Sequence, residues 1–325
     1  MINMKSIRKL FRWKMLVFLG LLYVQLGCKS DGNKHTVQSD TPVRGNIKIA
    51  ADVSLKELVE NLLFVFENTY LDASLECIYL SENKLSQQLM QDSFRMMIIH
   101  RPLNDQELNY FRQANVRPIQ ELIASDALAI ITYSQQDTLL TKNQLITTLS
   151  TDTGVFRQFV FEKKNTSTLT TILAMMNLNN QIPNHFYGMD SIAIIIDYLY
   201  KNKQAAALIP AILLENEPFI SNTEIKVIGI YSHTNRNQDI VSYPFQAYMS
   251  DSSYPLVRGI YTVTAEGRSG LGTGFASFIA SDVGQRIVLR LGLLPATMPQ
   301  RTVEIRNSIP LTPLELENKN KKKSQ

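Results

Sequence analysis

The chain has 325 residues, of which 45% are hydrophobic and 19% charged, and its formal net charge is +4. This composition is typical of globular proteins and excludes a largely disordered chain. The positive charge lies at the ends, in a basic run at residues 1–14 and a lysine-rich tail at 306–325 that we predict to be disordered. The body between them is mildly acidic, which excludes the basic footprint of a nucleic-acid-binding protein.

Residues 1–27 have the pattern of a secretory signal peptide, because the basic run is followed by the apolar stretch Met15–Leu26 and by the small residue Gly27. Cys28 follows directly, an order typical of a bacterial lipoprotein, so we predict that cleavage leaves a lipidated Cys28 as the first residue. The third position before the cysteine, usually Leu, holds Gln25. Two alternatives stay open: a retained membrane anchor, for which the apolar stretch is short, and a signal cut elsewhere without lipidation.

The next segment, residues 28–45, is polar and contains glycine and serine, which predicts a flexible tether. Lipid and tether together would hold the protein at the periplasmic face of a membrane. In well-studied Gram-negative lipoproteins, Asp directly after the lipidated cysteine favours the inner membrane. Lys29 stands in that position, so we predict the outer membrane.

Strand-like and helix-like segments alternate through the first half of the body. In chain order we predict a strand at 46–51, a helix at 55–70 capped by Ser54, a strand at 75–80, a helix to residue 91 capped by Ser81, a strand at 95–99, a helix at 105–114 capped by Asn104, and strands at 116–123 and 127–133. Such a succession predicts an α/β fold with largely parallel sheets.

The second half continues in the same way. We predict a helix at 141–149, a strand at 155–161, a helix at 165–177, a helix at 190–202, strands at 205–210, 224–231 and 259–265, one helix at 274–291 ended by Gly292, a turn at 295–299 and a short strand at 302–305.

Most residues with reactive side chains form no recognisable site. The four histidines, His35, His100, His185 and His233, lack the spacing of zinc ligands, and Cys77 is predicted to be a buried thiol in a strand. Asp126 is predicted to be a turn or hinge residue. The glycine-rich run 270–274 lacks the Lys-Ser/Thr ending of a P-loop and is predicted to begin a helix. We expect no metal, no cofactor and no catalytic residue.

Three segments share a strand, a small polar residue and a helix start: 51–55, 79–83 and 161–169. A helix N-terminus presents free N–H groups and partial positive charge, so several converging starts would form an anion site. Ordinary helix capping is the alternative for each segment. The run from Asn165 to Thr168 has more small polar residues than one cap requires.

The order of these segments resembles the phosphate-binding proteins of ABC phosphate transporters, in the type 2 periplasmic binding protein superfamily. The resemblance covers roughly residues 46–305. It rests on the first strand with Ser54 and Leu55, Ile98–Leu103, Asp126–Ile131, the helix start Thr166–Thr168, Tyr254–Arg258, and the closing segments Gly284–Val288 and Gly292–Pro295.

The resemblance implies two α/β lobes joined by hinge strands, with lobe I at 46–130 plus 245–305 and lobe II at 131–244. It implies that a small oxyanion, phosphate first, is held between the lobes and passed to an ABC transporter permease. The implied ligand residues are Ser54, Leu55, Ser81, His100, Arg101, Asn165, Thr166, Ser167 and Thr168.

Three positions depart from the family pattern. His100 stands where the family commonly has either the Asp that accepts the phosphate proton or a Ser before Arg-Pro-Leu. Residues 162–164 lack the family's Arg, and residues 207–212 lack its glycine-rich turn. These departures support a second hypothesis, an interaction protein of a cell-envelope complex that keeps the fold with a degenerate ligand site. A third hypothesis, a phosphatase, needs a nucleophile that the sequence does not reveal.

Overall fold

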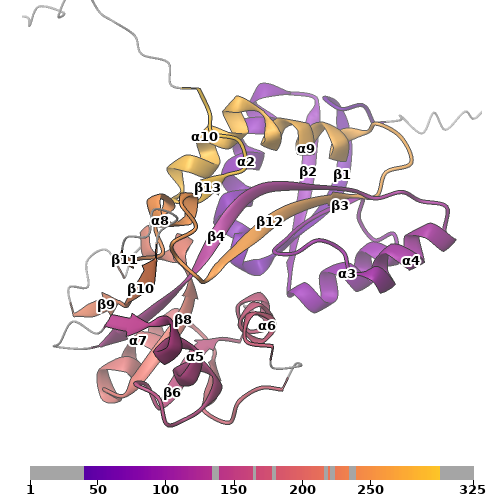
Figure 1. Cartoon of the computed structure of the whole chain (residues 1–325). Coiled ribbons are helices and arrows are strands. Elements are labelled where there is room, and N and C mark those ends of the chain that lie inside the picture. Colours follow the sequence, from indigo (N-terminus) through magenta and orange to yellow (C-terminus); the bar gives the residue numbers. More distant parts are fainter. Residues whose placement is uncertain are drawn as a thin grey trace, which may run out of the picture. The chain divides into compact units, whose positions relative to one another are not determined.

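The computed structural model describes residues 40–133, 139–163, 166–177, 181–215, 219, 224–233 and 239–300 (Figure 1). The signal peptide, Cys28, Asn165, the strand expected at 302–305 and the basic tail lie outside the described residues.

The first half of the body follows the expected alternation of strands and helices. Its elements are β1 (Gly45–Asp52), a 3-10 turn η1 (Val53–Leu55), α2 (Lys56–Thr69), β2 (Ala73–Leu80), α3 (Glu82–Met90), β3 (Met96–Ile99), α4 (Asp105–Gln113) and β4 (Ile119–Tyr133). The apolar face expected on α2 is buried, with Leu58, Val59, Leu62 and Phe66 all at 0% exposure.

The second half contains more strands than the sequence predicted. Its elements are β5 (Leu139–Thr141), α5 (Lys142–Ser150), β6 (Gln158–Glu162), α6 (Thr166–Met175), β7 (Phe186–Met189), α7 (Ile192–Lys201), β8 (Ala205–Pro210), η2 (Ala211–Glu215), β9 (Ile225–Val227), β10 (Gly229–His233), β11 (Asp239–Ser242), α8 (Gln246–Ser250), β12 (Val257–Thr264), α9 (Leu271–Ala280), α10 (Asp282–Arg290) and β13 (Leu294–Pro295). The strand expected at 224–231 is interrupted at Ile228, so that β9 pairs with β4 and β10 joins a separate small sheet with β5 and β11.

The strands form a ten-stranded sheet in which β4 is shared by two groups of strands. The order is β2-β1-β3-β12-β4-β8-β6-β7, with β9 and β13 also on β4. Residues 119–127 of β4 pair with β12, whereas residues 128–132 pair with β8. We call the strands on the β12 side the first sheet half and those on the β8 side the second sheet half.

The prediction of largely parallel sheets is wrong at the centre of the sheet. The outer strands are parallel, since β1 pairs in parallel with β2 and β3, and β6 with β7 and β8. The central strands β12 and β4 are antiparallel to each other, and each is antiparallel to its other main neighbour. Strand–helix alternation predicts the parallel strands at the two ends of the sheet. It does not predict the positions or directions of the central strands β4 and β12.

Helices cover both faces of the first sheet half (Figure 1). α2, α9 and α10 enclose one core, in which the ring of Phe66 lies 5.2 Å from that of Phe275 and 5.3 Å from that of Phe278. α3 and α4 enclose the core on the opposite face. Two further apolar clusters pack on the second sheet half.

Two expected boundaries were wrong because a polar residue has a different role from the one assigned. The strands expected at 116–123 and 127–133 are the single strand β4, since the buried carboxylate of Asp126 is paired within the sheet. The helix expected at 274–291 breaks at Ser281, whose extended backbone and hydroxyl cap a second helix. Gly284 permits this break, because a Cβ there would lie 2.4 Å from the carbonyl oxygen of Ile279.

Candidate functional site

Polar side chains gather where the ends of β1 and β3, the middle of β4 and the start of β12 meet the N-terminus of α6. We call them the central polar cluster: Asp52, Ser54, His100, Asp126, Ser167, Thr168 and Arg258. All except Ser54 are buried. Buried polar groups need hydrogen-bond partners, so the pairing of each one indicates what the cluster can bind.

Asp52 organises the first side of the cluster. Its Oδ1 accepts hydrogen bonds from the Ser54 N–H at 2.9 Å, the Ser54 hydroxyl at 2.6 Å and the Ser167 hydroxyl at 3.2 Å. The expectation that Ser54 caps the first helix is therefore wrong: Asp52 caps η1, and Leu55 precedes α2 without a side-chain cap. Burial raises the pKa of Asp52, against the lowering effect of these hydrogen bonds.

His100 lies on the other side of Ser54. Its Nε2 is 2.8 Å from the Ser54 hydroxyl oxygen. Burial, together with the positive charge of Arg258, lowers the pKa of His100 well below its usual range. The imidazole is therefore neutral at physiological pH.

Asp126 and Arg258 form a buried ion pair across two neighbouring strands. They are register partners of β4 and β12, and Arg258 reaches Asp126 Oδ2 through Nη2 at 2.9 Å and Nε at 3.2 Å. Arg258 Nη1 also lies 3.4 Å from the Ser167 hydroxyl, so the pair contacts α6. The sequence pattern gives these two residues no site role. The prediction that Asp126 is a turn or hinge residue is wrong, since Asp126 lies within β4.

Arg101, an expected ligand residue, is committed to neighbouring protein groups. It bonds to Glu82, Glu107, Ser86 and the carbonyl oxygen of Pro102, which together take all five of its N–H groups. The carboxylate of Glu107 is the main reason that the pKa of Arg101 is raised. Glu82 in turn accepts from the hydroxyl of Thr170 at 3.4 Å, which links α3 to α6.

The remaining expected residues differ in their positions. Leu55 packs in the core under α2, and Ser81 precedes α3 without a side-chain capping bond. Thr166 begins α6, and Ser167 and Thr168 follow in its first turn, where backbone N–H groups have no partner within the helix. Three buried atoms of the cluster have no hydrogen-bond partner in the part of the chain that the structure describes: Asp52 Oδ2, His100 Nδ1 and Thr168 Oγ1.

The charges of the cluster are compensated with one exception. Arg258 is paired with Asp126 and, outside the cluster, Arg101 is paired with Glu82 and Glu107. Asp52 forms no ion pair with a described residue, although the positive charge of Arg258 acts to lower its pKa. The cluster therefore offers directed hydrogen-bonding groups and no unpaired cation.

The glycine-rich run 270–274 begins helix α9, as expected. The carboxylate of Glu266 accepts from the N–H groups of Gly270, Gly272 and Thr273, and Asp40 accepts from that of Leu271. Because the protein's own carboxylates cover this helix start, it has no place for a phosphate group.

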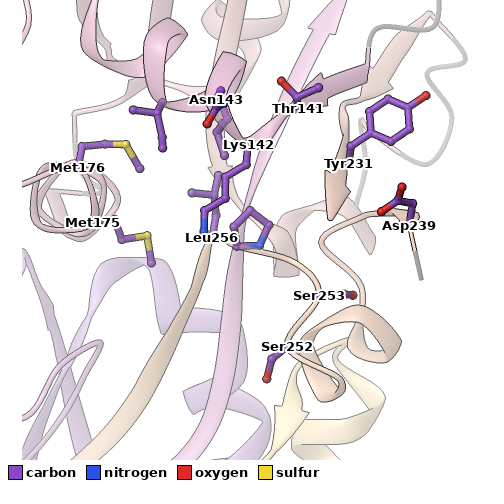
Figure 2. A pocket seen from close by; sticks show the side chains of 13 residues that line it. Thr141, Lys142, Asn143, Met175, Met176, Tyr231, Asp239, Ser252, Ser253 and Leu256 are labelled. Carbon is purple, nitrogen blue, oxygen red and sulfur yellow. The ribbon is translucent and has the colours of Figure 1, made fainter. Parts of the chain in front are cut away.

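A separate groove of about 1010 Å³ lies at the C-terminal end of α6 (Figure 2). Figure 2 shows Met175 and Met176 on one side, Lys142 and Asn143 from the start of α5, and Tyr231 on β10 at the far side. None of the expected ligand residues lines this groove.

Within the described ranges, every helix is too short or too polar to traverse a lipid bilayer. The same ranges contain no group of three or more His, Cys, Asp or Glu side chains arranged to hold a metal ion.

A family model described as a PBP superfamily domain matches residues 36–283. No curated protein matches the sequence. An ABC transporter substrate-binding protein from Clostridium perfringens, solved with bound phosphate, superposes with a TM-score of 0.60 at 16% identity, over 78% of this chain and 100% of that one.

Two other solved structures have the same fold. An ABC-type phosphate transport receptor from Vibrio cholerae matches with a TM-score of 0.59 at 15% identity, over 77% of this chain and all (100%) of that one. A possible phosphate binding protein from Planctomyces limnophilus matches with a TM-score of 0.55 at 12% identity, over 78% of this chain and 94% of that one. These comparisons confirm the two-lobed α/β fold expected from the sequence.

Proposed function

Because the chain belongs to the PBP superfamily domain family, a substrate-binding fold, we propose that the central polar cluster binds an oxyanion, phosphate first. The α6 N-terminus would donate backbone N–H groups to the oxyanion, and Ser167 and Thr168 would add hydroxyl groups. Asp52 would accept a hydrogen bond from a protonated oxygen of the ligand. This role needs no catalytic residue and no cofactor.

The observation that carries this proposal is the buried, unpartnered Oδ2 of Asp52 beside the start of α6. A carboxylate oxygen at 0% exposure is costly without a donor, and an O–H group of phosphate is such a donor. His100 replaces the family's acceptor Asp in sequence, but Asp52 brings a carboxylate into the cluster from the end of β1. Sulfate carries no proton near neutral pH and cannot donate to it.

Binding would require the two sheet halves to separate at the cluster. Three hydrogen bonds join the side of the first sheet half to α6. Asp52, at the end of β1, and Arg258, in β12, bond to Ser167, and Glu82, which follows β2, bonds to Thr170. An oxyanion placed between Asp52 and α6 would replace the first of them. We propose a hinge motion in which β4 bends where its partner changes from β12 to β8, after Ala127.

Isothermal titration calorimetry on the mature chain, residues 28–325, tests the proposal with phosphate, sulfate and molybdate. We expect phosphate to bind and sulfate to bind more weakly or not at all. Absence of binding to all three at millimolar ligand would contradict an oxyanion-binding role.

A second candidate function has a specific observation in its favour. Asp52 Oδ1 already takes three donors from Ser54 and Ser167 that would otherwise be offered to an oxyanion. The carboxylate could thus stand in place of the ligand, and the protein would serve as an interaction partner in a cell-envelope complex. No calorimetric binding, together with unchanged cellular function after the double substitution Thr166→Ala and Thr168→Ala, would favour this function.

We also propose that lipid on Cys28 holds the protein at the periplasmic face of a membrane, the outer membrane in preference, and that residues 28–45 let it reach an ABC transporter permease. Cys28→Ser is expected to move the protein from the membrane fraction to the soluble fraction, because it removes the lipid-bearing thiol. Cys77→Ser is the matched control, since Cys77 lies within β2, and should leave the protein with the membrane. Membrane association of the Cys28→Ser protein would instead mean that the apolar segment is a retained anchor.

A further inference from the structure

The hydrogen bonds around Ser54 fix the position of the proton on His100. The Ser54 hydroxyl lies 2.6 Å from Asp52 Oδ1, and an ionised carboxylate only accepts, so the hydroxyl proton points to Asp52. The Ser54 oxygen must then accept from His100 Nε2, 2.8 Å away. In a neutral imidazole with the proton on Nε2, the other ring nitrogen, Nδ1, carries a bare lone pair.

His100 Nδ1 and Asp52 Oδ2 are thus two acceptors without donors. The residues are 5% and 0% exposed, and neither atom has a partner in the described part of the chain. Both residues hydrogen-bond to the same Ser54 hydroxyl, so they lie at the same end of the central polar cluster. A ligand with two O–H groups would satisfy both atoms.

The charges that face these two acceptors disfavour a doubly charged ligand. Two cations lie on this side of the cluster, and each is paired with a carboxylate. Arg258 on β12 pairs with Asp126 on β4. Arg101, which follows β3, pairs with Glu82 on α3 and with Glu107. The α6 helix, Thr166–Met175, contains no charged residue. Asp52 adds a negative charge that forms no ion pair among the described residues, so a second negative charge on the ligand would meet no free cation there.

We infer that His100 is a specificity-determining acceptor which, together with Asp52, selects the oxyanion that carries two O–H groups and one negative charge. For phosphate this is the dihydrogen form, in preference to the hydrogen phosphate dianion. The inference rests on the proposed oxyanion-binding function and names the form of the ligand that the site takes.

The first test is the affinity of the mature chain for total phosphate as a function of pH. On the alkaline side of the second ionisation of phosphate, the dihydrogen fraction falls with each pH unit, so the apparent Kd should rise by about tenfold per unit. At low pH the carboxyl of Asp52, whose pKa burial raises, takes a proton and stops accepting, so affinity should pass through a maximum.

The second test is His100→Gln. The glutamine amide can still donate to Ser54 from the position of Nε2, but it places no acceptor where Nδ1 was. We expect the phosphate affinity at pH values below the second ionisation of phosphate to fall by roughly tenfold. Above that ionisation, the apparent Kd should rise less steeply with pH than in the wild-type chain. His185→Gln is the matched control, because His185 is equally buried and bonds to the carbonyl oxygen of Thr148, outside the cluster.

The outcomes separate the two proposals. If the wild-type chain binds no phosphate at any pH, the proposed function fails. If the chain binds phosphate with equal affinity at pH values below and above the second ionisation of phosphate, the proposed function stands and the selection by His100 is wrong. The same conclusion follows if His100→Gln keeps the wild-type dependence of the apparent Kd on pH. Should His100→Gln fail to fold, the imidazole ¹⁵N spectrum of the wild-type protein decides: a bare Nδ1 whose shift changes on phosphate addition supports the inference, and a protonated Nδ1 overturns it.

Discussion

Replacing Arg258 with leucine is expected to lower the free energy of unfolding by about 3–5 kcal/mol, because Asp126 would remain buried without its cation. The side chains of the pair are 3% and 1% exposed, so water cannot replace the lost partner. Besides Arg258, Asp126 keeps the backbone N–H of Ala127, which hydrogen-bonds to Oδ1. Urea denaturation followed by circular dichroism measures the loss.

The matched control for Arg258→Leu removes both partners. The double variant Asp126→Leu with Arg258→Leu should be clearly more stable than the single variant, because two apolar side chains leave no buried charge. Lys201→Ala breaks the exposed ion pair with Asp197 and should cost about 0.5 kcal/mol or less. A double variant as unstable as the sum of its two single variants would show that the pair acts through packing and not through charge.

Asp52→Asn is expected to reverse the preference between phosphate and sulfate. The amide oxygen can keep the three donors that Asp52 Oδ1 now holds, while the amide nitrogen replaces the acceptor Oδ2 with a donor. Phosphate affinity should fall by roughly ten- to a hundredfold, the value of a hydrogen bond to a charged group. Sulfate affinity should rise, because the fully deprotonated anion gains a donor and loses a repelling charge. Calorimetry with both anions measures the two changes.

Asp190→Asn controls for the general effect of removing one negative charge. Asp190 is exposed and pairs with Lys163, outside the central polar cluster, so this variant should keep the wild-type preference. Unchanged phosphate affinity in Asp52→Asn would mean that Asp52 does not receive a ligand proton, and the oxyanion would have to bind elsewhere.

The sequence predicts the outer parts of the sheet well, because local periodicity determines them. The apolar spacing of residues 55–66 and the strand at 205–210 are found as expected, and Asn104 caps α4 together with Glu107. The central strands are not predicted in the same way. Whether β12 lies beside β4, and in which direction, depends on packing between segments more than a hundred residues apart in sequence.

In the candidate site too, residues marked by a local sequence signal are predicted, whereas residues brought together by strand pairing are not. Ser167 and Thr168 are predicted because helix starts with small polar residues are a local signal, and His100 is predicted through the family resemblance. Arg258 and Asp126 were missed as site residues because only the strand register makes them partners. A usable signal existed, since a charged residue inside an apolar strand requires a partner of opposite charge.

β4 makes the two sheet halves a single folding unit. Its residues 119–127 complete the hydrogen bonding of β12, and its residues 128–133 do the same for β8 and β9. A fragment that ends in the middle of β4 would lose one set of ladder hydrogen bonds and expose a bare strand edge. The halves should therefore melt in one calorimetric transition, and neither should be obtainable alone as a folded, soluble fragment.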